Sequence, residues 1–193
     1  MHRQPAKVLE PVDVRLLLGH INAQTYSARN RVMILLSFKA GLRACEISGL
    51  EWPMILTTER RVGRQITIAR AIAKKGSGRV IPLHRELAVA LRNLHKSEGK
   101  PPTGAVIRSE RGERLSPGSV VNWFSQVYRE LDLTGCSSHS GRRTFITTSA
   151  RVLARTGGSL RDIQELAGHR ALTTTERYIQ GDRAAQRRLI SLI

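Results

Sequence analysis

Apolar side chains follow two different spacings along this chain, and that contrast limits the folds open to it. In residues 65–69 (QITIA) polar and apolar side chains alternate as in a half-buried strand, and residues 79–83 (RVIPL) are a second strand candidate. Residues 74–78 (KKGSG), between them, have the composition of a hairpin turn. We therefore expect a small antiparallel sheet, because parallel strands need a long crossover connection.

Helical spacing dominates the rest of the chain. Gly41 follows one such segment in the manner of a glycine just past a helix C-terminus. Ser116 followed by Pro117 is the pattern of a helix start. Helices are expected over residues 13–21, 27–40, 43–49, 86–95, 116–131, 140–154, 159–167, 173–179 and 182–193. The predicted fold class is therefore mostly α with a small antiparallel β-sheet, an α+β fold.

The length of 193 residues fits one domain with short extensions. Apolar residues make up 40% of the chain, which is enough for a hydrophobic core. We divide the chain into a loose N-terminal leader (1–10), one main domain (11–181) and a C-terminal tail helix (182–193).

The charge of the chain points to a polyanionic partner. There are 32 Lys and Arg residues against 15 Asp and Glu, a formal net charge of +17. A compact domain this basic repels itself unless it meets a polyanion, and nucleic acid is the first candidate. The alternatives are that the basic surface meets an anionic membrane, or that the chain is itself a basic protein such as a ribosomal component.

Cysteine usage and hydropathy favour a cytoplasmic, nucleoid-associated protein. Cys45 and Cys136 lie far apart and outside any Cys/His cluster, so we expect no structural zinc site. The N-terminus has no apolar signal region, and no apolar run approaches the roughly 20 residues of a membrane helix. We therefore expect no membrane association.

Cutting DNA requires a nucleophile, proton transfer and neutralisation of charge on the phosphate. Acidic residues are few and scattered, so the chain lacks the clustered carboxylates that hold the ions of a two-metal mechanism. We therefore expect no metal or other cofactor. The alternative mechanism uses side chains alone, and arginine suits it because its planar fork binds phosphate oxygens while keeping its charge.

The chain contains residues of the types that this second mechanism needs. Arg43 follows a predicted helix end, with Glu46 one turn later to hold it. His139 and Arg142 lie three residues apart, on one face if the segment is helical. His169 stands beside a glycine, and Tyr178 follows nine residues later.

These segments resemble, in order, the signatures of the tyrosine recombinases, the integrase and Xer-like family. The matching stretches are GLRACEISGL, KKGSGRVIPL, HSGRRTFIT and LAGHRALTTTERYI, and the resemblance covers roughly residues 8–180. Each motif alone is weak, whereas all of them in the family's order are specific. The resemblance implies the tyrosine recombinase catalytic-domain fold for residues 11–181.

The resemblance also implies a role for each matching residue. Tyr178 would attack the scissile phosphate, giving a 3′-phosphotyrosine and a free 5′-hydroxyl without metal or ATP. Arg43 and Arg142 would bind the non-bridging oxygens, and His169 would donate a further hydrogen bond. His139 would be the acid–base partner for the proton of Tyr178. A lysine of the hairpin would protonate the leaving oxygen; counting back from Pro82 favours Lys74 over Lys75.

Taken singly, each of these residues has a plainer interpretation. Arg43 could be a solvated arginine at a helix end, Lys74 a polar turn residue and His139 an ordinary residue at a helix start. His169 alone is more often structural than catalytic, and a lone tyrosine such as Tyr178 usually lies at the edge of a core. Glu46 is interpreted as structural support for Arg43.

Two features depart from the family pattern. Gly141 stands where the family usually has leucine, and Arg143 stands where it often has histidine. Many relatives also carry a separate N-terminal domain that closes around DNA. Here the catalytic part begins within about ten residues of Met1, so the chain resembles catalytic-domain-only members such as the fimbrial phase-switch recombinases, or a catalytic-domain fragment.

The partners implied are double-stranded DNA, further copies of the chain as a homo-tetramer on two DNA sites, and accessory DNA-bending proteins. Residues 189–193 (LISLI) are strongly apolar for a terminus, so we expect the tail to dock into a neighbouring protomer, with folding back on its own domain as the alternative.

Three other functions remain open from sequence. A regulator with the same fold would bind DNA without cutting it. A topoisomerase IB-like enzyme would share the chemistry but need no pair of sites. A structural RNA-binding protein would leave the ordered residue set unexplained. The DNA target sequence, and the choice between integration, excision, inversion and resolution, lie beyond the sequence.

Overall fold

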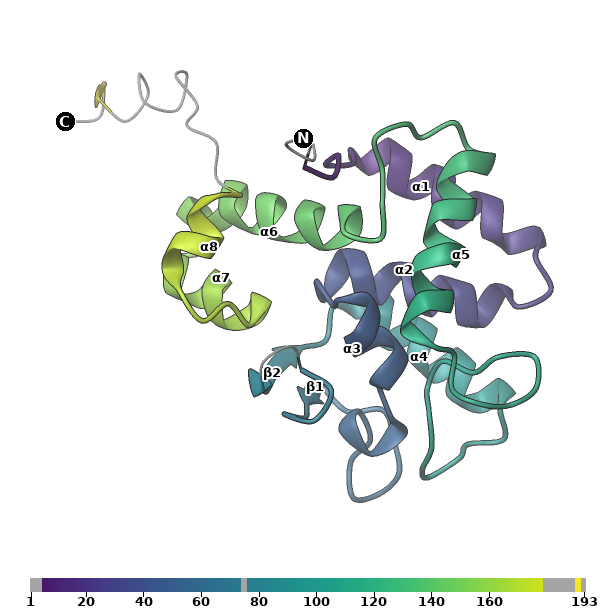
Figure 1. Ribbon diagram of the computed structural model, residues 1–193. Coiled ribbons are helices and arrows are strands. Elements are labelled where there is room, and N and C mark those ends of the chain that lie inside the picture. The colour runs from purple at the N-terminus through teal and green to yellow at the C-terminus, as the bar shows by residue number, and fades with distance from the viewer. Residues whose placement is uncertain (1–4, 74–75, 179–189, 192–193) are drawn as a thin grey trace.

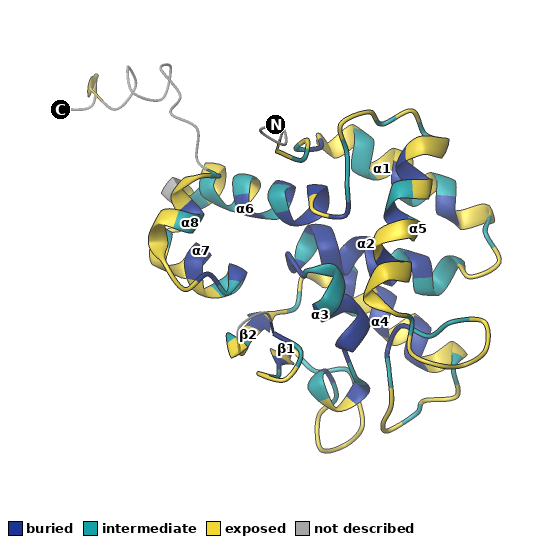
Figure 2. Cartoon of the chain, in the orientation of Figure 1, coloured by how far each residue is buried: buried dark blue, intermediate teal, exposed yellow. Residues whose placement is uncertain are grey.

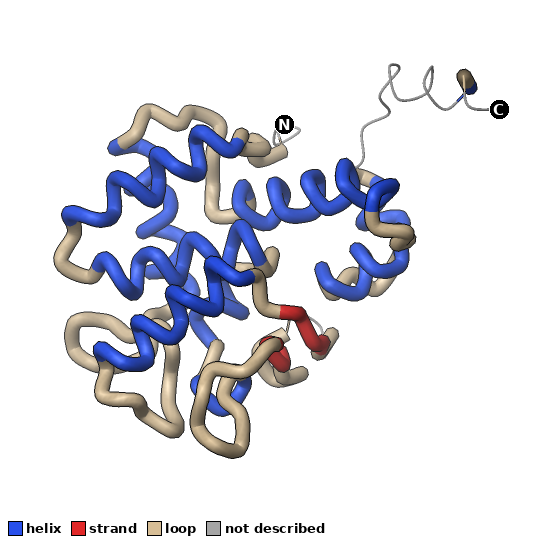
Figure 3. The backbone as a smooth tube through the Cα atoms, turned by 180° about the vertical axis from the view of Figure 1, so that it is seen from behind, coloured by secondary structure: helices blue, strands red, loops and turns tan. Residues whose placement is uncertain are grey.

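The fold is described from a computed structural model of the 193-residue chain. The structure describes residues 5–73, 76–178 and 190–191. Helices dominate, and one small two-stranded sheet lies beside them, as Figures 1 and 3 show from opposite sides. The predicted fold class, mostly α with a small antiparallel sheet, is confirmed.

The elements follow one another along the described chain in the order helices, hairpin, helices. The α-helices are α1 (Pro11–His20), α2 (Ser27–Lys39), α3 (Ala44–Gly49), α4 (Arg85–Ser97), α5 (Pro117–Glu130), α6 (Ser140–Val152), α7 (Leu160–Ala167) and α8 (Leu172–Glu176). The strands are β1 (Gln65–Ile68) and β2 (Arg79–Pro82). Short 3₁₀ turns are η1 (Ile21–Ala23), η2 (Trp52–Met54) and η4 (Leu153–Arg155).

Helix α2 forms the centre of the main core. Its run Val32–Phe38 is buried throughout, as expected for a helix covered on all sides, and it packs against α4 on one side and α6 on another. Figure 2 shows this buried helix inside the shell of partly exposed ones. Gly41 has φ +63° just past the end of α2, which confirms its expected role.

The hairpin forms with the predicted direction and nearly the predicted length. Strands β1 and β2 pair antiparallel, with Ile66 opposite Ile81 and Thr67 opposite Val80. Ile66, Ile68 and Ile81 face the core, so the alternation read from the sequence is the alternation of burial. The expected turn falls partly on residues 74–75, which lie outside the described residues.

The start of α5 agrees with its capping signal in the sequence. Ser116 caps α5 through its side chain, which accepts a hydrogen bond from the Ser119 backbone N–H at 3.0 Å, and Pro117 is the first residue of the helix. Where the signals were weak, the bounds differ: α8 runs Leu172–Glu176 instead of 173–179. The expected helix 182–193 lies almost wholly outside the described residues.

A second, smaller apolar cluster lies between helices α6 and α7. Its buried members are Ile146, Ile163 and Ala167, and Tyr178 packs against them. Helix α6 leads from the main core to this cluster, and the hairpin lies next to α7 (Figure 1). In the segment expected to be a leader, Leu9 is buried and its backbone N–H donates to Thr144 Oγ1 on α6 at 2.9 Å.

Gly141, the departure from the family's leucine, lies where α6 crosses α2. A Cβ atom at this position would stand 2.1 Å from Ser37 Oγ and 3.0 Å from the Phe38 ring. The two helices therefore approach more closely than any side chain at residue 141 permits. The absence of a side chain at Gly141 and the small side chain of Ser37 opposite it together allow this close approach.

We expect Gly141→Ala to lower the free energy of unfolding by about 1–3 kcal/mol, because overpacking forces α6 away from α2. Thermal and urea unfolding monitored by circular dichroism would measure the loss. Adding Ser37→Gly in the same chain should restore part of it. A Gly141→Ala protein as stable as the wild type would show that the crossing of α6 and α2 has room for a methyl group at residue 141.

Among the helices that the structure describes, none has the length and apolar character needed to cross a bilayer.

Candidate active site

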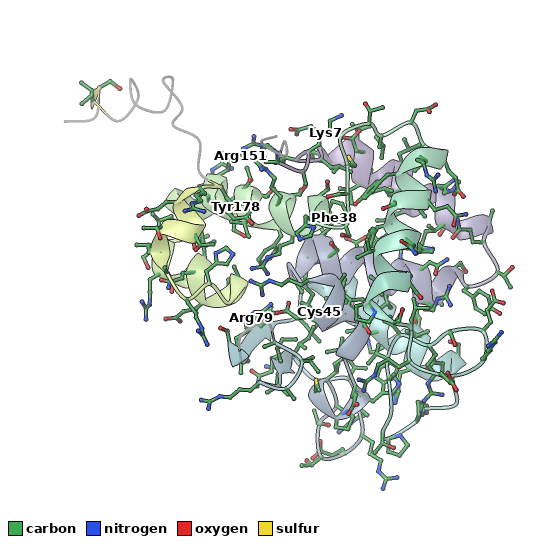
Figure 4. All side chains as sticks on the ribbon, in the orientation of Figure 1. Lys7, Phe38, Cys45, Arg79, Arg151 and Tyr178 are labelled. Atoms are coloured by element: carbon green, nitrogen blue, oxygen red, sulfur yellow. The ribbon has the colours of Figure 1, made fainter. Side chains whose placement is uncertain are left out.

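The residues singled out in the sequence come from four separate parts of the chain. Arg43 is at the N-terminus of α3, Arg142 is in the first turn of α6, His169 follows α7, and Tyr178 follows α8. Figure 4 labels Tyr178 and Arg79, which lie on the side of the molecule where the hairpin meets α7.

Arg142 is the most buried cation of the group, with 4% of its surface exposed. Its Nη1 donates to the Gly41 carbonyl at 2.6 Å, and its Nη2 donates to the Ala167 carbonyl at 2.5 Å and to His169 Nε2 at 2.9 Å. Burial, together with repulsion from Arg43, lowers the pKa of Arg142 to about 10, so it stays cationic at neutral pH. The side chain ties α6 to the ends of α2 and α7.

His169 has a contact at each ring nitrogen. Arg142 has only donors, so Nε2 accepts from it, and Nδ1 carries the proton and donates to Thr175 Oγ1 at 2.9 Å. Burial, followed by the charges of Arg142 and Arg43, lowers the pKa of His169 to about 4. The ring is therefore neutral at physiological pH.

Arg43 is held by Glu46, as the sequence suggested. Its Nη1 donates to Glu46 Oε1 at 2.9 Å, and its backbone N–H donates to Oε2 at 2.9 Å. Glu46 is fully buried, which alone would raise its pKa. Hydrogen bonds and charge from Arg79 and then Arg43 outweigh burial and lower the pKa of Glu46 to about 2.

Tyr178 lies half-buried beside His169. The two rings stack with centroids 5.7 Å apart and planes inclined by 20°. The guanidinium of Arg143, the residue that replaces the family's histidine, lies 5.9 Å from the centre of the same phenol ring. Thr147 Oγ1 donates to the Tyr178 carbonyl at 3.4 Å. Side chains from α6 and the end of α7 thus fix the place of the ring.

His139 and Lys74 complete the predicted set. His139 is exposed at the N-cap of α6, three residues before Arg142, and its backbone N–H donates to Ser137 Oγ at 3.3 Å. Lys74 and its alternative Lys75 lie outside the described residues. The structure therefore brings Arg43, Arg142, His169 and Tyr178 into one region, with His139 at the start of the helix that carries Arg142.

Two residues of this region were missed in the sequence. Arg79, at the start of β2, binds Glu46 with both Nη atoms at 2.9 Å. Thr175 is fully buried and bonds to His169. Arg79 stands inside the KKGSGRVIPL stretch and Thr175 inside a run of three threonines, so neither residue type stands out by its spacing. Their partners lie in other segments, which sequence periodicity does not reveal.

The arrangement can bind and polarise an anion. Arg43 and Arg142 lie close enough together for the charge of Arg43 to lower the pKa of Arg142. An anion bound between the two guanidinium groups would offset their mutual repulsion. Within the described ranges, no three His, Cys, Asp or Glu side chains gather as metal ligands do. The phenol of Tyr178, the residue predicted to be the nucleophile, lies against the same cluster through its stack on His169.

Comparison with known proteins shows to which family this chain belongs. The family model described as the phage integrase family matches residues 7–184. Curated relatives include tyrosine recombinase XerC of Myxococcus xanthus, 30% identical over 182 residues, which are 90% of this chain and 54% of that protein. XerC of Mesorhizobium japonicum is 32% identical over 164 residues, 82% of this chain and 48% of that protein.

The fold is shared with solved recombinase structures. The Tn1549 transposon integrase in complex with transposon right end DNA is similar over the whole chain and 67% of its own, with a TM-score of 0.76 and 18% identity. XerA recombinase gives a TM-score of 0.72 at 18% identity, over 100% of this chain and 66% of its own.

A third structure, the integrase from mycobacterium phage Brujita, is 26% identical with a TM-score of 0.58, over 92% of this chain and 55% of its own. The chain spans about half the length of the curated relatives that it matches. Since the family model covers nearly all of the sequence, the chain belongs to the phage integrase family, whose fold here is that of a tyrosine recombinase catalytic domain.

Proposed function

We propose that this chain catalyses site-specific recombination of double-stranded DNA through a covalent 3′-phosphotyrosine at Tyr178. The observation that carries the proposal is the stack of Tyr178 on His169, which is itself hydrogen-bonded to the buried Arg142. The names of the relatives, tyrosine recombinases, support the same activity.

In the proposed step the phenolic oxygen of Tyr178 attacks the scissile phosphorus. The new bond joins that oxygen to phosphorus, and the bond between phosphorus and the 5′-oxygen breaks. The tyrosine proton passes to a base, for which we propose His139, and the leaving 5′-oxygen takes a proton from Lys74. Since the phosphotyrosine retains a phosphodiester bond, religation needs no ATP.

Arg43 and Arg142 are proposed to bind the non-bridging oxygens of the scissile phosphate. A guanidinium has five N–H donors. Three of those of Arg142 point to the Gly41 carbonyl, the Ala167 carbonyl and His169 Nε2, which leaves two for a phosphate. Preorganised donors of this kind stabilise the charge that develops in the transition state.

His169 can donate to the phosphate after a change of tautomer. Its Nδ1 faces the Thr175 hydroxyl, which can donate as well as accept. If the hydroxyl donates to Nδ1, the ring proton moves to Nε2, and Nε2 then donates to an oxygen that takes the place of the Arg142 contact. We therefore propose that Thr175 allows His169 to carry its proton either on Nδ1, as in the contact with Arg142, or on Nε2, as in the contact with phosphate.

A suicide substrate, a nicked DNA site that traps the cleaved strand, tests the proposal. The wild-type chain should form a protein–DNA adduct that survives SDS. A regulator with the same fold would bind the DNA and form no adduct. A topoisomerase IB-like enzyme would form an adduct and also relax any supercoiled plasmid, whereas the proposed recombinase needs a pair of its sites. The DNA around the gene, searched for inverted repeats, would supply the site.

We expect cleavage to persist in excess EDTA, because the charge of the phosphate is neutralised by Arg43 and Arg142 instead of a metal ion. The rate of adduct formation on the suicide substrate, with and without EDTA, measures this. A loss of cleavage that only magnesium restores would point to a metal-dependent nuclease.

Recombination of two sites requires more than one active site, so we propose a homo-tetramer on two DNA sites, with accessory DNA-bending proteins as further partners. The tail 182–193, proposed to dock into a neighbouring protomer, falls outside the described residues except for Ile190 and Ser191. The net charge of +17 suits a nucleoid-associated, cytoplasmic protein.

A further inference from the structure

Arg79 joins three elements of the candidate active site. Arg79 is the first residue of β2, and its side chain is 5% exposed. Its guanidinium makes a bidentate contact with the carboxylate of Glu46 in α3. The Nη1–Oε1 and Nη2–Oε2 distances are both 2.9 Å. On the other edge of the guanidinium, Nε donates to the Leu166 carbonyl in the last turn of α7 at 2.8 Å.

The carboxylate of Glu46 is shared between Arg79 and Arg43. Oε1 accepts from Nη1 of each arginine, and Oε2 accepts from Arg79 Nη2 and from the Arg43 backbone N–H, each at 2.9 Å. A buried carboxylate with four donors is fully satisfied. Glu46 is therefore held between the two arginines, with Arg79 bound to both of its oxygens and Arg43 bound through its side chain and its backbone N–H.

The end of α7 is shaped to receive Arg79. Gly168 has φ +62°, and a Cβ atom there would stand 2.9 Å from Arg79 Nη1. The absence of a side chain at Gly168 leaves room for the guanidinium of Arg79 at the helix end. His169 follows directly, and the neighbouring Ala167 carbonyl accepts from Arg142. One helix end thus carries contacts to both Arg79 and Arg142.

We propose that Arg79 is a positioning residue of the cleavage reaction, which sets Arg43 and His169 against the same phosphate by bridging Glu46 to the end of α7. Arg79 differs from Arg142 in its acceptors: its charge is paired with the carboxylate of Glu46, whereas Arg142 donates to two backbone carbonyls and a neutral imidazole. This inference rests on the proposed function, because it concerns the rate of that reaction.

The consequence is a defect in rate without an equal defect in binding. Arg79→Met should lower the single-turnover rate of adduct formation by about 10²-fold, the cost of a misplacement of about 1 Å. DNA affinity should stay close to that of the wild type. Arg79→Lys, which keeps a charge beside Glu46 but cannot reach both Glu46 and Leu166, should recover part of the rate. Arg92→Met, on the exposed face of α4, is the control for the lost charge and should cleave normally.

The pH dependence separates positioning from a general loss of structure. Among the causes that lower the pKa of Glu46, Arg79 is the largest, so its removal raises that pKa. Arg43 faces the same carboxylate, and Arg142 and His169 lie within reach of its charge. The rate of Arg79→Met relative to the wild type should therefore fall as the pH is lowered, starting at a higher pH than any such fall in the wild type, as Glu46 takes up a proton and releases Arg43.

A second variant identifies the titrating group. Adding Glu46→Gln to Arg79→Met removes the carboxyl, so the double variant should be slow at every pH but without the additional fall in acid. Because the charges of Arg79 and Glu46 also act on the pKa of His169, the comparison is repeated with His169→Gln in both chains, where the fall in acid should again appear only in the chain that keeps Glu46. If the fall in acid persists without Glu46, Arg79 does not act through this carboxylate and the inference is wrong.

The outcomes distinguish this inference from the proposed function. A wild-type chain that forms no adduct would overturn the proposed function, and this inference with it. A wild-type chain that cleaves, together with Arg79→Met and Arg79→Lys variants that cleave as fast, would overturn the inference alone. Equal losses of rate and DNA affinity in a folded Arg79→Lys protein would make Arg79 a DNA-binding residue and also overturn it.

Discussion

Replacing Tyr178 with phenylalanine should abolish covalent attachment to DNA while leaving DNA binding close to that of the wild type. The substitution removes only the phenolic oxygen. The ring keeps its place, since its contacts are the stack on His169, 5.7 Å between centroids, and the apolar cluster around Ile146 and Ile163. A side chain without the oxygen cannot form the phosphotyrosine bond, so the expected loss of adduct is complete.

A gel of the suicide-substrate reaction in SDS measures the adduct, and a gel-shift assay measures binding. Tyr26→Phe is the matched control, because Tyr26 is exposed at the start of α2, where its ring contacts Arg29. This variant should form adduct like the wild type. An SDS-resistant complex formed by Tyr178→Phe would show that another residue is the nucleophile.

Arg142→Lys should lower the rate of cleavage by about 10²-fold, which corresponds to about 2.7 kcal/mol in the activation free energy. Lysine keeps the positive charge but has a single nitrogen. That nitrogen cannot span the Gly41 carbonyl, the Ala167 carbonyl and His169 Nε2 while also binding a phosphate. The helix ends that Arg142 joins would then lose their common partner.

The measurement is the single-turnover rate of adduct formation beside the dissociation constant for the same DNA. Arg151→Lys is the control, because Arg151 belongs to the same helix but its side chain is 63% exposed. It should change neither quantity appreciably. If Arg142→Lys weakens binding as much as it slows cleavage, Arg142 is a general DNA contact instead of a stabiliser of the transition state.

Residue type and order sufficed to predict the fold class and the residues now found together. Ile66, Ile68 and Ile81 alternate in the sequence as they alternate in burial, because a strand has a period of two. Arg43 and Glu46 lie one helical turn apart, so their contact is local and visible in the sequence. Arg142 and His169 stood out because their motifs match a known family.

The contacts that join distant segments could not be predicted. Arg79 meets a carboxylate 33 positions earlier in the chain and a carbonyl 87 positions later. Gly141 departs from the family pattern, and its reason, the close crossing with Ser37, is visible only when two helices are packed together. Sequence periodicity tells which face of an element is buried but not which residue of another element lies against it.

The most direct test of the central claim is to identify the residue that carries the DNA. The adduct from the suicide substrate would be digested with nuclease and trypsin, and the peptides would be analysed by mass spectrometry. Attack by the Tyr178 oxygen predicts a nucleotide attached through its 3′-phosphate to the peptide that contains Tyr178, and a free 5′-hydroxyl on the released strand. Attachment to Tyr26, Tyr128 or a serine, or a linkage through a 5′-phosphate, would contradict it.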